Sequence, residues 1–408
     1  MSQVEKTSSS TITRRGFLKR TGAVLGTSVA LGPLIQLRGS GQETNEPREL
    51  MFVVNNGDGS VTAIDTTTDE VVKTFEVGTT ASFPSNKHFD QGPIIATGLH
   101  TDDAKTVHIV DLSTGEVPHI IETGSSQNYT ELTPDGNYIL ASARFDDALL
   151  KIGANPDNPD FGQVVGRIER FQEAQPCDIS ITPDGRFAVE PDRNPPGSSQ
   201  AVSTVDVDTF EVAGTVPVPP IVADSPGDVE PFMLTGSRDG TLAFVETIEG
   251  SAGTVGVFDI SDPARPTEIK RFTPDDGLGE LPITDEFTAD DAFNFVINRN
   301  SSDITVVDVA NLEIVNTISL VEGGNPVAGD FSIDDEKFYV PIQNQDVVAV
   351  VDVERQEMIK TIEVGPEPVG AIARHMPVPT AEAVGIGSLP TLPSSTDHHC
   401  SLPCCGEV

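Results

Sequence analysis

Short apolar runs alternate with polar turns along most of the chain, from about residue 48 to residue 375. The runs are rich in Val, Ile and Thr, and clusters of Gly, Asp, Asn, Pro and Thr separate them. Runs of β-branched residues between such turn residues are typical of β-strands. The chain holds 31 Pro and 36 Gly, but the β-branched clusters favour a turn-rich fold over disorder. The pattern therefore predicts an all-β domain.

One unit of this pattern recurs along the domain. Each copy has an apolar run, an Asp, a polar turn, a Glu five residues after the Asp, and a second apolar run. The complete copies contain Asp65 and Glu70, Asp111 and Glu116, Asp206 and Glu211, Asp308 and Glu313, and Asp352 and Glu357. Asp259 begins a copy with a longer turn, and another copy falls near residues 149–168, where an insertion replaces the turn. An Asp carboxylate accepts backbone N–H groups, so we expect each Asp to open a turn between two paired strands.

A second turn marker lies between the units. It reads LTPDG at 132–136 and ITPDG at 181–185, with weaker forms at 237–240, 288–292 and 332–336. Pro presets φ and Gly adopts a positive φ, so Pro-Asp-Gly between apolar runs predicts a tight turn. Units of about 40–50 residues indicate the four-stranded blades of a β-propeller. We expect seven blades, closed by pairing of the N-terminal strands with the last inner strand; an open solenoid is the alternative.

These units resemble the YVTN family of seven-bladed propeller repeats. The resemblance is carried by the strand FVVNNGDGSVTAID at 52–65 and by the repeated Asp turns, and it covers roughly residues 48–375. It implies a seven-bladed β-propeller. It implies little about function, because propellers host many unrelated activities.

The N-terminus has a different character. Arg14 and Arg15 are followed by Phe17, Leu18 and Lys19, and no residue from Thr21 to Leu37 is charged. This segment resembles a twin-arginine export signal, which implies that the twin-arginine translocase exports the chain already folded. The protein would then work outside the cytoplasm, in the extracellular medium, at the cell surface or in a periplasm-like space. The uncharged run is shorter than the ~20 apolar residues of a spanning helix, so we expect no stable membrane span.

Three regions follow from these patterns. They are a signal peptide at 1–40, the propeller at 48–375, and a Pro- and Ser-rich linker with a Cys- and His-rich tail at 376–408.

The charge balance is strongly acidic. The chain has 63 acidic and 25 basic side chains and a net charge of −38. Such a charge repels nucleic acid and anionic lipid, so we expect no nucleic-acid partner. The acids are spread evenly and lysine is scarce, which is typical of proteins from high-salt organisms, where counterions screen the repulsion. The charge therefore indicates a halophilic habitat more than a partner.

Two groups of side chains are candidate metal ligands. Glu131, Glu286 and Asp330 share one repeat position on the expected inner strands, two residues before the turn, where three carboxylates could bind a cation such as Ca²⁺. The alternative is three solvated acids in a chain rich in acids. In the tail, thiols and imidazoles suited to zinc or copper are clustered at His398, His399, Cys400, Cys404 and Cys405. The alternative there is a disordered tail whose thiols oxidise or cross-link.

No sequence motif for catalysis was found. The chain has no nucleophile elbow, phosphate loop, dinucleotide fingerprint, His-Glu metalloprotease motif or C-X-X-C-H haem attachment site. Cys177 is alone and is interpreted as a small buried apolar residue. The sequence thus favours a non-enzymatic binding or scaffold module with an extracellular or cell-surface protein partner. The alternatives are an exported metal-dependent redox enzyme and a lactonase-like hydrolase on the same propeller.

Overall fold

The computed structural model describes residues 48–77, 94–98, 105–125, 127–170, 175–193, 201–221 and 229–376. Two compact units are distinguished, Met1–Thr44 and Asn45–Val408, and every described residue belongs to the second. The residues of the expected export signal and of the Cys- and His-rich tail lie outside the described residues. Among those described, no helix is both long enough and apolar enough to cross a membrane.

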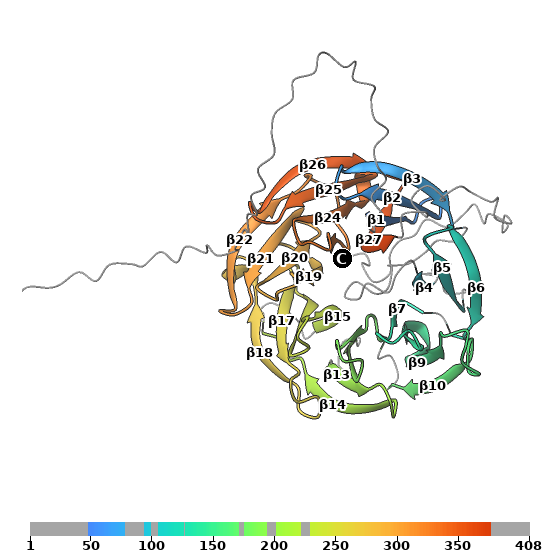
Figure 1. Ribbon diagram of the computed structural model, residues 1–408. Helices are drawn as coiled ribbons and strands as arrows, with labels where there is room; N and C mark the ends of the chain where they lie inside the picture. The colour runs from blue at the N-terminus through green and yellow to red at the C-terminus, as the bar shows by residue number, and fades with distance from the viewer. Residues whose placement is uncertain are drawn as a thin grey trace, which may run out of the picture. The chain divides into compact units, whose positions relative to one another are not determined.

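Seven antiparallel sheets form the blades of a β-propeller (Figure 1), which confirms the predicted fold. The first blade contains β27 (Pro368–Met376), β1 (Arg48–Asn55), β2 (Ser60–Asp65) and β3 (Glu70–Glu76). The second contains, among the described residues, β4 (Ile94–Gly98), β5 (Thr106–Asp111) and β6 (Glu116–Glu122). The third contains β7 (Tyr129–Leu132), β8 (Tyr138–Ala143), β9 (Ala148–Gly153) and β10 (Val164–Glu169).

The remaining four blades are each four-stranded. The fourth contains β11 (Ser180–Ile181), β12 (Phe187–Asp192), β13 (Ala201–Asp206) and β14 (Glu211–Pro217). The fifth contains β15 (Val229–Gly236), β16 (Leu242–Glu249), β17 (Thr254–Asp259) and β18 (Thr267–Phe272). The sixth contains β19 (Pro282–Phe287), β20 (Phe293–Asn298), β21 (Asp303–Asp308) and β22 (Glu313–Ser319). The seventh contains β23 (Asp330–Phe331), β24 (Lys337–Ile342), β25 (Val347–Asp352) and β26 (Glu357–Glu363).

In the described ranges, three short 3₁₀ turns connect strands: η1 (Arg144–Asp146), η2 (Pro274–Asp276) and η3 (Gln343–Gln345).

The repeated aspartates shape the turns between strands. In the first blade the carboxylate of Asp65 accepts the backbone N–H of Thr67 at 2.8 Å and that of Thr68 at 3.1 Å. In the Pro-Asp-Gly turns the Asp does the same: Asp135 accepts the backbone N–H of Asn137 at 3.0 Å. Gly136, next in that turn, has φ +70°. These contacts hold the tight turns that the spacing predicts.

Carboxylates also join loops of neighbouring blades at two junctions. Asp291 of the sixth blade accepts the backbone N–H groups of Arg238 and Asp239 of the fifth, at 2.7 and 2.8 Å. Asp335 of the seventh blade accepts the N–H of Ala289 of the sixth at 2.6 Å. Because these bonds cross between sheets, they link the fifth blade to the sixth and the sixth to the seventh.

The first blade takes strands from both ends of the domain. β1 pairs with β27 in antiparallel register, from Arg48 opposite Met376 to Asn55 opposite Pro368. The seventh blade adds side-chain contacts to the first: the hydroxyl of Tyr339 donates to Asp69 at 2.6 Å, and the ammonium of Lys337 lies 2.7 Å from the same carboxylate. The first and last strands of the described propeller are thus held by strand pairing, and side-chain contacts join the seventh blade to the first.

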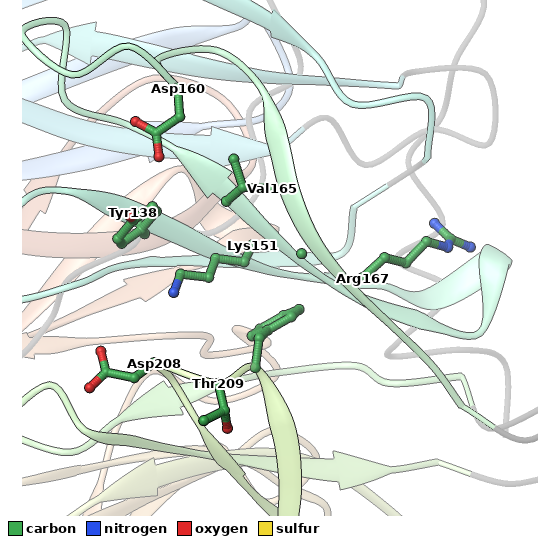
Figure 2. A pocket seen from close by; sticks show the side chains of 9 residues that line it. Tyr138, Lys151, Asp160, Val165, Arg167, Asp208 and Thr209 are labelled. Atoms are coloured by element: carbon green, nitrogen blue, oxygen red, sulfur yellow. The ribbon is translucent and has the colours of Figure 1, made fainter.

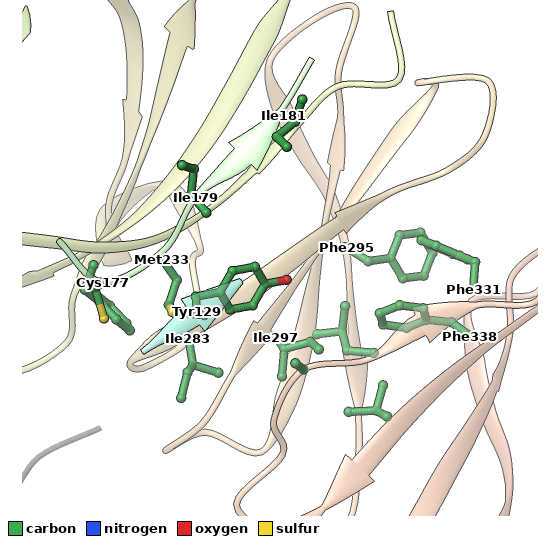
Figure 3. Close-up of a cluster of buried hydrophobic side chains, with 14 of the residues drawn as sticks. Tyr129, Cys177, Ile179, Ile181, Met233, Ile283, Phe295, Ile297, Phe331 and Phe338 are labelled. Atoms are coloured by element: carbon green, nitrogen blue, oxygen red, sulfur yellow. The ribbon is translucent and has the colours of Figure 1, made fainter. Parts of the chain in front are cut away.

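Apolar side chains fill the space between blades. One cluster of buried side chains draws on the inner strands of several blades and includes Tyr129, Met233, Ile283 and Phe331 (Figure 3). Another cluster lies between the fifth and sixth blades and includes Phe244 and its neighbours. The core is therefore distributed over the blade interfaces.

Tyr339→Phe is expected to loosen the contact between the seventh and first blades. The substitution removes a buried hydroxyl that donates to a charged acceptor, so the free energy of unfolding should fall by about 1.5 kcal/mol or more. Chemical denaturation measures the change. Ile359→Thr, at an exposed position of β26, is the control and should change stability by less than about 0.5 kcal/mol. Equal stability of the two variants would contradict the role given to the hydroxyl.

Candidate functional site

The charges of acidic side chains from four inner segments act on Tyr129. Burial raises the pKa of the Tyr129 hydroxyl well above its ordinary value, and the negative charges of nearby acids raise it further. These acids are Asp178, Glu131, Glu286 and Asp330, in decreasing order of effect. Figure 3 shows the Tyr129 ring beside Met233 and Ile283, with its hydroxyl at the outer end of the side chain. The centre of the propeller therefore combines an apolar cluster with several buried acidic side chains.

Two of these acids join neighbouring inner strands. The carboxylate of Asp178 accepts the backbone N–H of Leu234 at 3.0 Å, which links the fourth blade to the fifth. The carboxylate of Asp330 accepts the N–H of Ala373 at 2.9 Å, which links the seventh blade to β27. Each of these carboxylates satisfies a buried backbone donor of the adjacent blade, whose exposure without a partner would be costly.

A third central acid pairs with an arginine. Glu286 lies 3.2 Å from the guanidinium of Arg238, so this contact joins the sixth blade to the fifth. The side chain of Glu286 is fully buried, while that of Arg238 is 21% exposed. The partly exposed arginine therefore supplies a positive charge to a carboxylate that is buried between the two blades.

The three acids at the predicted carboxylate position are buried rather than solvated. Glu131, Glu286 and Asp330 are all at most 3% exposed, and all three act on Tyr129. Within the described parts of the chain, no group of three or more His, Cys, Asp or Glu side chains is gathered in a way that could hold a metal ion. Calcium binding by this set stays a prediction.

A surface cavity lies where the repeat is irregular. It has a volume of about 410 Å³ and lies between the third and fourth blades (Figure 2). Its walls are formed by Tyr138, Lys151, Asp160, Val165, Gly166, Arg167, Asp208, Thr209 and Phe210. Asp160 comes from the insertion near residues 149–168 that replaces the ordinary turn. Insertions that break a repeat are common places for binding sites.

Lys151 is the most unusual residue of this cavity. It lies within an otherwise apolar strand, and its ammonium donates to the carbonyl of Val207 at 2.7 Å and lies 4.2 Å from the centre of the Tyr138 ring. The negative charge of Asp160 raises the pKa of the Tyr138 hydroxyl. A Cβ at Gly166 would come within 2.5 Å of the Phe210 ring, so glycine permits this close approach. The cavity thus offers aromatic rings and charges of both signs.

Sequence reasoning missed this cavity. The signal was present in the strand ALLKIG, where a lysine replaces the apolar residue expected at a buried position, immediately before the insertion. A charged residue in a buried strand indicates a specific partner, here a carbonyl of the next blade.

Arg170 carries another buried charge cluster between the third and fourth blades. Its guanidinium lies 3.0 Å from Glu190 and 2.5 Å from Asp192. Burial and the neighbouring Asp192 raise the pKa of Glu190 well above its ordinary value, and the positive charge of Arg170 opposes this rise. The positive charge of Arg170 therefore faces two buried acids, and the contacts join the third blade to the fourth.

No family model and no curated protein matches this chain. Solved structures do match. A functionally unknown protein from Desulfotomaculum acetoxidans is 15% identical, with a TM-score of 0.62 over 80% of this chain and 99% of that one. Hydrazine synthase from Kuenenia stuttgartiensis is 15% identical, with a TM-score of 0.59 over 78% of this chain and 99% of that one. Dihydro-heme d1 dehydrogenase NirN is 15% identical, with a TM-score of 0.55 over 86% of this chain and 79% of that one. At this identity the likeness concerns the propeller fold alone.

Asp330→Ala and Asp178→Ala form a matched pair that separates a structural role from a metal-binding one. Both remove a carboxylate that accepts an N–H of the next blade, so each should lower the free energy of unfolding by about 1–3 kcal/mol. Only Asp330 belongs to the predicted calcium set. Denaturation and elemental analysis of both variants check this: similar losses of stability with unchanged calcium content are expected. A loss of calcium in Asp330→Ala alone would show that the central acids bind the metal.

Proposed function

We propose that this protein is an exported, non-enzymatic β-propeller that acts outside the cytoplasm as a binding or scaffold module. The twin-arginine pattern at Arg14 and Arg15 supports export, and the repeated Asp turns support kinship with YVTN propellers. The even acidic charge supports a high-salt setting. The partner would be an extracellular or cell-surface protein.

The observation that carries the non-enzymatic role is the use of the central acids. Asp178 and Asp330 accept backbone N–H groups of neighbouring blades, and Glu286 pairs with Arg238. A catalytic acid or base must be free to exchange a proton with a substrate. Side chains engaged in blade contacts instead give the propeller a fixed frame, which suits recognition at its loops and clefts.

The surface cavity between the third and fourth blades is a candidate place for such recognition. It presents the rings of Tyr138 and Phe210, with the ammonium of Lys151 4.2 Å from the centre of the Tyr138 ring. Aromatic and arginine side chains are enriched where proteins bind one another. The surface cavity therefore supports a role in binding a partner, and this role requires no catalytic step.

Two enzymatic alternatives make different demands. A metal-dependent redox enzyme would contain a stoichiometric redox metal such as iron or copper, or would be coloured. A lactonase-like hydrolase would release acid from a gluconolactone. The solved structures that match include proteins whose titles name enzymes, but at 15% identity they support the fold and no activity. A protein with either property would overturn the non-enzymatic proposal.

The export part of the proposal is tested by Arg14→Lys combined with Arg15→Lys. The full chain is expressed in a high-salt host, and the cytoplasmic and external fractions are compared by immunoblot. The wild-type chain should be found outside the cytoplasm, and the double variant should stay inside. Arg38→Lys, a basic residue beyond the motif, is the control and should be exported normally. Equal export of the wild type and the double variant would refute the twin-arginine route.

A further inference from the structure

The surface cavity between the third and fourth blades lies where two departures from the repeat coincide. At the fourth position of β9 the third blade has Lys151, whereas β21 and β25 have Val306 and Val350 at the corresponding position. The insertion that follows β9 replaces the ordinary Asp turn and brings Asp160 to the wall of the cavity. Continuation of the repeat requires neither residue, so their presence in one cavity favours a local role.

Lys151 is a buried cation without an anionic partner. It is only 8% exposed, and its ammonium donates to the carbonyl of Val207 and lies over the ring of Tyr138. Within the described parts of the chain it forms no ion pair, whereas Lys270, which also lies over an aromatic ring, pairs with Asp276. A carbonyl and a ring attract an ammonium but do not neutralise it, and an ammonium has three N–H donors. The cavity therefore presents a positive charge that an anionic group can accept.

Two carboxylates belong to the walls of the same cavity. Asp160 is half-buried and in hydrogen-bonding contact with the hydroxyl of Tyr138, and Asp208 is exposed in a turn of the fourth blade. The charge of Asp160 is the largest cause of the raised pKa of Tyr138, and the charge of Asp208 adds to it. Figure 2 shows the ammonium end of Lys151 on the side of the cavity where these residues lie. Both signs of charge are thus present beside one ring, and neither acid forms an ion pair with Lys151.

The other lining residues complete the picture of the cavity. The guanidinium of Arg167 already pairs with Glu169 at 2.5 Å and donates to the hydroxyl of Ser125 at 2.9 Å. Lys151 is therefore the cation of this cavity that has no carboxylate of its own. Phe210 and Val165 add apolar surface to the walls.

Three classes of ligand fit this arrangement poorly. An anion without a positive group would meet the two carboxylates and the net charge of −38 of the chain. A cation without a negative group would bring a second positive charge to the buried Lys151. A neutral molecule would leave the charge of Lys151 without a counter-anion. A ligand that carries one charge of each sign matches both the lysine and the acids.

We propose that the cavity binds a zwitterionic α-amino acid with an apolar side chain. Its carboxylate accepts hydrogen bonds from the ammonium of Lys151, and its amino group donates to Asp160 and Asp208. Its side chain lies against Phe210 and Val165. The volume of the cavity, about 410 Å³, falls within the range of about 300–1,000 Å³ that is typical of small-molecule sites. The assignment deepens the binding role proposed above and rests on it.

Binding of this kind suits the proposed high-salt setting. The Debye length is about 3 Å at 1 M salt, so attraction between charges over longer distances is screened. Charge-assisted hydrogen bonds at contact distance in a partly buried cavity are screened much less. A zwitterion has no net charge, so the acidic surface of the chain does not repel it.

The test measures binding of three probes of similar shape to the full chain at high salt, by ligand-observed NMR and isothermal titration. L-leucine carries both charges, L-leucinamide lacks the carboxylate, and isocaproate lacks the amino group. The wild type should bind L-leucine at least about tenfold more tightly than either analogue, because each analogue loses charge-assisted hydrogen bonds. Equal binding of L-leucine and one of the analogues, or no binding of L-leucine at millimolar concentration, would overturn the proposal.

Lys151→Met removes the positive charge and keeps the length of the side chain. It should weaken the binding of L-leucine at least about tenfold and abolish the preference for L-leucine over L-leucinamide. Lys270→Met is the matched control, because it removes a lysine that lies over a ring in another blade; it should bind L-leucine as the wild type does. Equal affinity of Lys151→Met and the wild type would remove Lys151 from the site.

Asp208→Asn keeps the proposal testable if Lys151→Met does not fold. Asp208 is exposed, so its substitution should leave the stability of the propeller nearly unchanged. The variant should bind L-leucine more weakly and should lose most of the preference for L-leucine over isocaproate. An undiminished preference would show that the amino group does not meet this carboxylate.

The same spectra separate this inference from the proposed function. Binding of L-leucine that leaves it chemically unchanged agrees with both. Conversion of L-leucine into another compound would keep the site and overturn the non-enzymatic role. Absence of binding would overturn the site alone, since export is measured by fractionation and catalysis by turnover.

Discussion

The structure depends on carboxylates that accept backbone N–H groups across the gaps between blades. A sheet satisfies its own backbone internally, but the ends of inner strands and the loops beside them leave donors with no partner in the same sheet. Asp178 and Asp330 satisfy such donors near the centre, and Asp291 and Asp335 satisfy them in the loops. Apolar packing between blades has no strong directional preference, whereas these bonds have one. At these junctions they therefore help to orient one blade against the next.

The same principle explains the acidic residues of the interior. A surface rich in acids suits a high-salt environment, but acids inside the fold need donors or cations of their own. The structure provides backbone N–H groups for Asp330, an arginine for Glu190 and Asp192, and a mixture of burial and arginine contact for Glu286. Acids of one chemical kind thus fill different roles, which are set by the groups that each of them meets.

The fold could be predicted from the sequence because the patterns that indicate it are local. The Asp turns, the Pro-Asp-Gly turns and the β-branched runs each lie within a few residues, and the structure places strands where they predict them. The residues that contact the buried acids could not be predicted from the sequence. Asp178 meets Leu234 and Glu246 meets Asp285 across tens of residues, and only the blade geometry brings them together. The cavity beside Lys151 escaped prediction for a related reason, since its walls come from two blades.

The first blade has a consequence for the order of folding. Because β27 supplies its inner strand, this blade lacks a strand until residue 376 has been synthesised, while the other blades are built from consecutive segments. Until then one edge of β1 remains without its partner strand. A nascent chain would therefore assemble its blades in sequence and join its ends last, over the longest separation in the domain. Such late, long-range pairing slows folding, so completion of the ring sets the time at which the chain becomes resistant to proteases and to aggregation.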